Sequence, residues 1–212
     1  MRRAKKYRGV SRLLAEFGQK ADAIRARLEE FARVRPEEYF YELAYCICTP
    51  QSSAQHASRA VALMQSADIE GSHDDPLPYL HQKTHYIRFH RTKARHLVRA
   101  RDAFPQIRLE LQNGHTSQGL REWLVDRVYG LGWKEASHFL RNIGHRNLAI
   151  LDRHILRNLK EHGVLRAVPD SLSRRQYLDV ERQFLTFAEH VGISMDELDL
   201  LFWSRATGEI LK

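Results

Sequence analysis

One lysine and one aspartate have the residue types and the surroundings for nucleophilic chemistry. Lys134 follows two glycines in the stretch GLGWK, and Asp152 comes 18 positions later (152 − 134), directly before RHILRNL. A lysine can be a surface charge, a clamp for a phosphate or, as a neutral amine, a nucleophile that forms a Schiff base. The residues alone leave these three roles open for Lys134, and Asp152 is in the position of a helix N-cap.

The glycines before the lysine lie between two stretches with the apolar spacing of helices. A helix–GxG–helix unit leaves backbone N–H groups exposed at the start of the second helix, where the helix dipole also favours an anion. Because Gly130 and Gly132 have no side chain, a phosphate can approach this helix start closely. The pattern predicts a sequence-independent grip on a nucleic-acid backbone. The spacing alone leaves a tight turn without a ligand as the alternative.

The composition agrees with an anionic partner. The 212 residues include 34 Lys and Arg against 26 Asp and Glu, which gives a net charge of +8. Such a balance favours nucleic acid ahead of a membrane surface, although basic composition alone can also serve solubility. The chain has no apolar run of the roughly 18 residues that a membrane helix needs. The basic start MRRAKKYRGVSR has no apolar stretch behind it, so we expect a cytoplasmic protein.

No metal or cluster is expected from the ligand-type residues. Cys46 and Cys48 are the two cysteines of the chain and lie in the apolar run YELAYCICTP. Their spacing suits neither a disulfide framework nor a zinc site, and two cysteines do not supply an iron–sulfur cluster. We therefore predict buried free thiols, and the 12 histidines show no convincing ligand spacing.

The elements that must position these residues are helices. Apolar residues recur mostly at intervals of three and four, and alternation typical of strands is scarce, so the sequence predicts an all-α fold. Ser52 or Ser53, Asp152 and Ser194 are expected as N-caps of helices. The main predicted helices cover about residues 11–34, 37–49, 54–64, 84–104, 119–129, 133–143, 153–162, 173–190 and 195–207.

The stretches GLGWKEASHFLRNIG and LAILDRHILRNL resemble the helix-hairpin-helix DNA glycosylase superfamily. In its bifunctional members the Lys of the GxGxK motif is the nucleophile, and an Asp that caps a later helix assists it. The resemblance implies that Lys134 attacks C1′ of a nucleoside, displaces the base and forms a Schiff base, with Asp152 as the assisting carboxylate. β-Elimination would then nick the strand. Related hairpins hold a monovalent cation through their carbonyls, so one is possible here; no other cofactor is expected.

The resemblance also implies one glycosylase unit over residues 1–212, built of two helical lobes with the active site in the cleft between them. The central lobe would cover about residues 36–150 and contain the hairpin at 120–144. The second lobe would combine residues 1–35 and 151–212.

The end of the chain, GEILK, resembles the second type of 8-oxoguanine DNA glycosylase, which is known mainly from archaea and some bacteria. That family ends in a lysine that contacts 8-oxoguanine, and a Trp nine residues earlier stacks on the flipped base. Here these residues are Lys212 and Trp203. 8-Oxoguanine has an N7–H donor where guanine has a lone pair. A buried acceptor placed at N7 therefore rejects guanine.

Two further stretches are similar to the superfamily. CTPQSSA, residues 48–54, resembles the loop that pushes a polar side chain into the gap left by the extruded base, which implies this role for Gln51. IRFHRTKARHL, residues 87–97, resembles a basic helix with an aromatic residue that sandwiches the lesion, here Phe89. The basic residues that would contact phosphates are Arg88, Arg91, Lys93, Arg95, Arg99 and Arg101; a solvated helix face is their alternative reading.

We predict a bifunctional 8-oxoguanine DNA glycosylase and AP lyase. It would act as a monomer on double-stranded DNA containing 8-oxoguanine, without a membrane partner, and associate with the nucleoid when acting. One alternative is a glycosylase for oxidised pyrimidines that resembles endonuclease III, which the missing iron–sulfur cysteines weaken. The other is a non-catalytic helix-hairpin-helix module. It explains the charge and the glycines but needs neither Lys134 nor Asp152.

Overall fold

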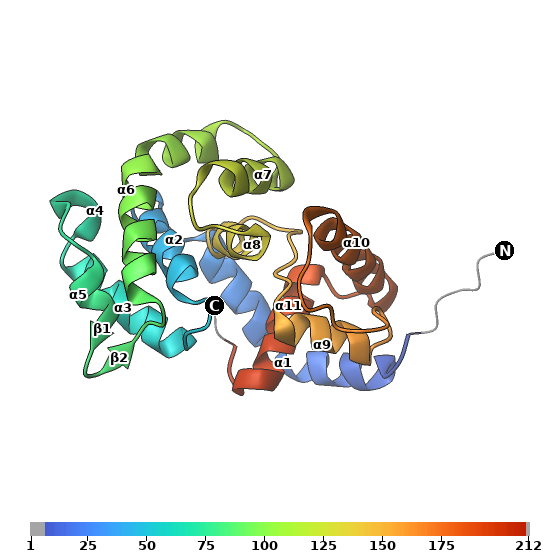
Figure 1. Ribbon diagram of the computed structural model, residues 1–212. Helices are drawn as coiled ribbons and strands as arrows, with labels where there is room; N and C mark the ends of the chain where they lie inside the picture. Colours follow the sequence, from blue (N-terminus) through green and yellow to red (C-terminus); the bar gives the residue numbers. More distant parts are fainter. Residues whose placement is uncertain (1–6, 211–212) are drawn as a thin grey trace. The chain divides into compact units, whose positions relative to one another are not determined.

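The computed structural model describes residues 7–210, and the prediction of an all-α fold is confirmed. These residues form eleven α-helices, one short 3-10 helix and one two-stranded hairpin (Figure 1). The elements are α1 (Val10–Ala32), η1 (Pro36–Glu38), α2 (Tyr39–Cys48), α3 (Ala54–Ser66), α4 (Ile69–Ser72), α5 (Leu77–Leu80), β1 (His81–Gln82), β2 (His85–Tyr86), α6 (His90–Gln112), α7 (Ser117–Arg127), α8 (Trp133–Asn142), α9 (Arg153–Glu161), α10 (Arg174–Val191) and α11 (Met195–Thr207).

The chain divides into two compact units. The first contains α1 and α9 to α11, and the second contains η1, α2 to α8 and both strands. The chain passes from the first unit to the second after Arg33 and returns to the first at Gly144. Each unit therefore carries its own part of the predicted chemistry: the hairpin with Lys134 is in the second unit, and Asp152 is in the first.

The second unit is built around α2, which packs against α3, α6 and α8 (Figure 1). Its sequence YFYELAYCIC is apolar on almost every face, as expected for a helix inside a core. Cys46 and Cys48 are buried free thiols, as predicted. Burial raises the pKa of the Cys48 thiol to about 12, so this group stays protonated and unreactive near neutral pH.

The first unit is built around α11, which packs against α1, α9 and α10. Near the end of α11, the guanidinium of Arg205 contacts two of these helices, α1 and α9. It donates to both carboxylate oxygens of Glu16 on α1, with the shortest distance 2.7 Å, and to Oδ1 of Asn158 on α9 at 2.5 Å. The hydrogen bond from Arg205 lowers the pKa of Glu16. This partly buried cluster fixes the C-terminal turn of α11, which carries Trp203.

Several helices begin at the N-caps that local sequence rules predict. Ser53 Oγ accepts from His56 N at 3.0 Å. Ser194 forms a capping box with Glu197. These caps satisfy N–H groups that have no partner within the helix.

Helix α6 begins later and ends later than predicted. The expected start at Thr84 is wrong, because residues 81–86 pair as an antiparallel hairpin, with His81 opposite Tyr86 and Gln82 opposite His85. The helix also continues past Pro105 to Gln112. An interior proline costs about 3 kcal/mol, but Phe104 and Ile107 are both buried on this helix. Burial of two such side chains contributes roughly 1.5–3 kcal/mol each, which is enough to offset that cost.

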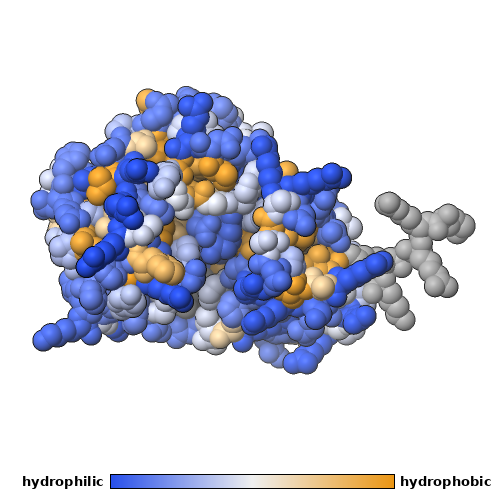
Figure 2. Space-filling view, viewed as in Figure 1, coloured by the Kyte–Doolittle hydropathy of each residue, from blue (hydrophilic) through white to orange (hydrophobic). Residues whose placement is uncertain are grey.

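The face shown in Figure 2 is mostly hydrophilic, with apolar side chains in separate patches. None of the helices between residues 7 and 210 is both long and apolar enough to cross a membrane. Two of the most exposed aromatic side chains are Phe89 and Tyr129, at 50% and 59%. Both belong to segments that the sequence analysis connects with DNA.

Candidate active site

Lys134 lies in the first turn of α8, directly after the glycine turn. The N-cap of this helix is Gly132, which has extended backbone and makes no side-chain capping hydrogen bond. The side chain of the N-cap residue therefore occupies none of the N–H groups of the first turn. An anion that binds at a helix start needs such N–H groups as donors. The side chain of Lys134 is 28% exposed, and its Nζ lies 3.1 Å from Oε1 of Glu135.

Glu135 is a candidate functional residue that the sequence analysis missed. A lysine must lose a proton before it can act as a nucleophile, and this carboxylate is a proton acceptor in contact with the amine. Its position next to Lys134, in the first turn of a helix, was the only signal in the sequence.

The two glycines of the hairpin have different tasks. Gly130 has φ +90°, and a Cβ atom at this position would lie 2.3 Å from Nδ1 of His96 on α6. Gly132 has φ −93°, which any residue adopts. There a Cβ would meet only the carboxylate of Glu135, at 2.9 Å. Gly130 is thus required by the turn itself, whereas at Gly132 the absence of a Cβ leaves room for the carboxylate of Glu135.

Residues of α6 support the hairpin. The ring of His96 meets Tyr129 edge to face, with centroids 5.0 Å apart. The guanidinium of Arg99 lies 4.2 Å above the ring of Tyr129. The hairpin is therefore packed onto the basic helix within the same unit.

Asp152 is the N-cap of α9, as predicted. Its Oδ1 accepts a hydrogen bond from the backbone N–H of Ile155 at 2.8 Å. Within residues 7–210, its second oxygen, Oδ2, has no hydrogen bond. The helix thus orients the carboxylate through Oδ1.

Trp203 lies beside the same end of α9. Its ring centroid is 5.2 Å from that of His154, with 47° between the planes. His154 is two residues after Asp152 in the first turn of α9. The first unit therefore brings Trp203 to the end of α9 that Asp152 caps, through contact with His154, a residue that the sequence analysis did not single out. Lys212 lies outside the described residues.

Gln51 and Phe89 are both exposed and both have left-handed backbone, with φ +58° and +59°. Such values are uncommon for residues other than glycine and cost of order 1 kcal/mol or more. The sequence analysis expected Phe89 within a helix. It is the N-cap of α6 instead, because the preceding residues form the β1–β2 hairpin.

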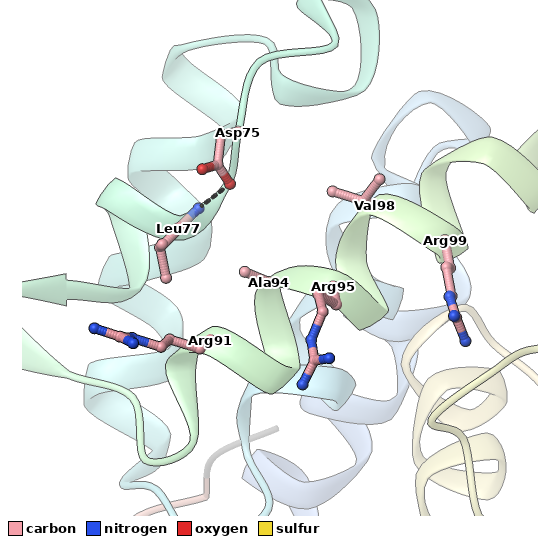
Figure 3. A pocket seen from close by; sticks show the side chains of 7 residues that line it. All are labelled: Asp75, Leu77, Arg91, Ala94, Arg95, Val98 and Arg99. Atoms are coloured by element: carbon pink, nitrogen blue, oxygen red, sulfur yellow. Dashed lines mark hydrogen bonds between the residues drawn. The ribbon is translucent and has the colours of Figure 1, made fainter.

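The basic face of α6 is smaller than predicted. Lys93 and Arg101 are buried, at 6% and 8% exposure, and Arg101 donates to the carbonyls of Ile69 and Asp74. Helical spacing of four residues places Arg91, Arg95 and Arg99 on one exposed face. They line a hollow of about 660 Å³ together with Asp75, Leu77, Ala94 and Val98 (Figure 3).

An all-α chain with a glycine hairpin, a lysine directly after it and an aspartate that caps a later helix has the features of a helix-hairpin-helix DNA glycosylase. A family model described as 8-oxoguanine DNA glycosylase matches residues 24–193. This chain belongs to that family, and the predicted family is thereby confirmed.

Relatives and solved structures match along nearly the whole chain. A Korarchaeum cryptofilum protein named 8-oxoguanine DNA glycosylase/AP lyase is 40% identical over 192 residues, 90% of this chain and 91% of the relative. The crystal structure of the 8-oxoguanine DNA glycosylase of Thermotoga maritima has a TM-score of 0.84 at 32% identity. It covers 96% of this chain and 98% of its own.

A third match is the Methanocaldococcus jannaschii 8-oxoguanine glycosylase/lyase in complex with a 15mer DNA that contains 8-oxoguanine. It has a TM-score of 0.80 at 33% identity and covers 94% of this chain and 99% of its own.

Proposed function

We propose that this protein excises 8-oxoguanine from double-stranded DNA and then nicks the abasic site by β-elimination. The observation that carries the proposal is the placement of Lys134. It follows the glycine hairpin in the first turn of α8, in a chain that belongs to the 8-oxoguanine DNA glycosylase family. A non-catalytic DNA-binding module would need the hairpin but not this amine.

The reaction begins with proton loss from Lys134, for which Glu135 Oε1 at 3.1 Å is the acceptor in contact. The amine attacks C1′, and the bond from C1′ to N9 breaks with its electron pair leaving on the base. Asp152 stabilises the positive charge that develops on the sugar. Opening of the sugar ring gives the Schiff base between Nζ and C1′. Loss of a proton from C2′ then expels the 3′ phosphate and cuts the strand.

Four side chains are proposed to extrude and recognise the base. Trp203 and Phe89 each stack on the base, at about 1–3 kcal/mol per base. Gln51 fills the gap in the duplex, and Lys212 contacts 8-oxoguanine and separates it from guanine. Extrusion of this kind is needed because the target atom cannot be reached inside a stacked duplex.

The DNA backbone is proposed to contact the hairpin and the exposed arginines of α6. Guanidinium groups bind phosphate oxygens with charge-assisted hydrogen bonds. The enzyme would act as a monomer, without a membrane partner, on DNA of the nucleoid. Its chemistry needs no cofactor, because the lysine supplies the nucleophile.

The carbonyl oxygens of Gly130 and Leu131 are the proposed ligands of a monovalent cation at the hairpin. Within residues 7–210 these two oxygens accept no hydrogen bond from a backbone N–H of the turns and loops, and carbonyl oxygens are suitable ligands for such ions. Bound there, a cation would supply positive charge next to a DNA phosphate.

The experiment that tests the function is borohydride trapping with wild-type protein. Duplexes that differ only at one position would contain 8-oxoguanine, guanine or an oxidised pyrimidine. We expect a covalent adduct and a strand nick with 8-oxoguanine and neither product with guanine. A preference for the oxidised pyrimidine would favour the alternative that resembles endonuclease III. DNA binding without any adduct would favour the non-catalytic module.

Replacement of Gly130 by alanine should weaken DNA binding by about tenfold or more, which corresponds to a loss of about 1.4 kcal/mol in binding free energy. The left-handed backbone costs an alanine roughly 1–2 kcal/mol, and its Cβ would displace His96, which supports the hairpin. Gly114→Ala is the matched control, since Gly114 also has a positive φ, +68°, but open space around its Cβ position. Fluorescence anisotropy with a stable abasic-site analogue measures the affinity. Equal affinities for the two variants would contradict this role of Gly130.

A further inference from the structure

Lys93 is a basic residue of α6 whose side chain points into the protein. It is 6% exposed. Its Nζ donates to the carbonyls of Cys48 and Pro50, at 2.7 and 2.6 Å, and lies 3.3 Å from Oγ of Ser52. An ammonium has three donors, and all three are used by one short loop. A buried charge is costly unless it is fully hydrogen-bonded, so this loop and Lys93 depend on each other.

The loop held by Lys93 is a tight turn that presents Gln51. The N–H of Ser52 donates to the carbonyl of Thr49 at 2.9 Å, so that Pro50 and Gln51 are the two central residues. Positive φ at the second central position is typical of a type II turn, where glycine is preferred. Glutamine stands there instead, with φ +58°. Strained backbone of this kind persists where the surrounding structure fixes it. Lys93 Nζ donates hydrogen bonds to Pro50 and Ser52, the residues on either side of Gln51.

Ser52 connects this turn with a second strained residue. Its Oγ also accepts the backbone N–H of Arg88 at 3.0 Å, and the next residue is the exposed Phe89, with φ +59°. The carbonyl of Phe89 in turn accepts the backbone N–H of Lys93 at 2.9 Å. Lys93 and Ser52, here called the Lys93–Ser52 pair, thus connect the turn that carries Gln51 with the segment that carries Phe89.

The Lys93 side chain stays charged in this pair although its burial favours the neutral amine. Desolvation by burial lowers the pKa of Lys93 to about 8, and the nearby charge of Lys134 also lowers it, whereas the charge of Glu135 raises it. Near pH 7 the group is still mostly an ammonium with three donors. Lys93 is therefore a buried ammonium whose three hydrogen bonds all go to one turn. These bonds fix the conformation of that turn.

We propose that Lys93 is a positioning residue, which acts with Ser52 to hold Gln51 and Phe89 in one fixed arrangement. Gln51 can then enter the gap in the duplex as Phe89 stacks on the extruded base. The inference rests on the proposed function of these two residues. It concerns extrusion and holding of the base rather than the attack by Lys134.

The test compares two substrates in Lys93→Met, which keeps a long side chain but removes the charge. On an 8-oxoguanine duplex at pH 7, we expect the single-turnover excision rate to fall by about 10- to 100-fold, because misplacement of a positioning group has effects of this size. On a duplex with a ready-made abasic site there is no base to extrude. Borohydride trapping there, followed to the pH at which each protein reaches its maximum rate, should stay within about threefold of wild type. Lys83→Met is the matched control, because Lys83 is exposed in the β1–β2 turn.

A second comparison asks whether Lys93 acts through the two presented residues. In a Gln51→Ala, Phe89→Ala background, Lys93→Met should slow excision little further, since groups that act together are not additive. Ser52→Ala decides the question if Lys93→Met does not fold. It should slow excision selectively, whereas Ser53→Ala removes the cap of α3 and should lower only stability.

The inference would be overturned if Lys93→Met excised 8-oxoguanine at the wild-type rate, or if its rates fell equally on both duplexes. It would also be overturned if Lys93→Met slowed excision as much in the double-alanine background as in wild type. Wild-type excision by Ser52→Ala would overturn it as well. Absence of any adduct with wild-type protein is a different outcome and would overturn the proposed function itself.

Discussion

Lys134→Gln is expected to form no covalent adduct with 8-oxoguanine duplex DNA under borohydride and to leave the strand intact. An amide nitrogen does not attack C1′ and forms no Schiff base, so the route to β-elimination is lost. We expect the single-turnover excision rate to fall at least about 10³-fold, or about 4 kcal/mol in the barrier. Product formation on denaturing gels, with wild-type protein in parallel, measures both effects.

The same variant should still fold and bind DNA. The side chain of Lys134 is part-exposed and its partner in the structure is Glu135; an ion pair of this kind contributes about 0–1 kcal/mol. The hairpin that grips the backbone is unchanged. Lys160→Gln serves as the control, because it removes an exposed lysine from α9 and should keep full activity. An undiminished adduct with Lys134→Gln would mean that another amine is the nucleophile.

Local chemistry explains which features could be predicted from the sequence. Asp152 and Ser194 are N-caps as predicted, and Ser53 is the cap among the two serines proposed for α3, because a cap depends on residues within one helical turn. The all-α fold followed from apolar spacing that repeats along most of the chain.

The features that were missed depend on residues far apart in the chain. Lys93 looks like part of a basic helix face, and only the turn some 40 residues earlier makes it a buried hydrogen-bond donor. The start of α6 was misplaced because the β1–β2 hairpin forms by pairing between strands. Gln51 and Phe89 were named by resemblance, but their left-handed backbone has no signal in residue type. His154 was overlooked because Trp203, its partner, lies on another helix.

Asp152→Asn is expected to slow excision by about 10²- to 10³-fold, the usual worth of one preorganised electrostatic contact, about 3–4 kcal/mol. The amide oxygen of asparagine can accept the hydrogen bond of Ile155 N in place of Oδ1. Asparagine caps helices about as well as aspartate, so α9 should keep its start. The variant removes the negative charge and little else. Thermal unfolding should stay close to wild type, and excision at saturating protein concentration measures the chemical effect.

Asp152→Ala separates the two roles of this residue. It removes the charge and also the cap, so it should slow excision as much as Asp152→Asn while also lowering the free energy of unfolding by about 1 kcal/mol. Ser173→Ala removes a comparable cap from α10 in the same unit and should cost similar stability without slowing excision. If Asp152→Asn excises 8-oxoguanine at the wild-type rate, the carboxylate is only a helix cap. If it is slow and as stable as wild type, the charge of Asp152 acts on the sugar, because its effect on the helix has been held constant.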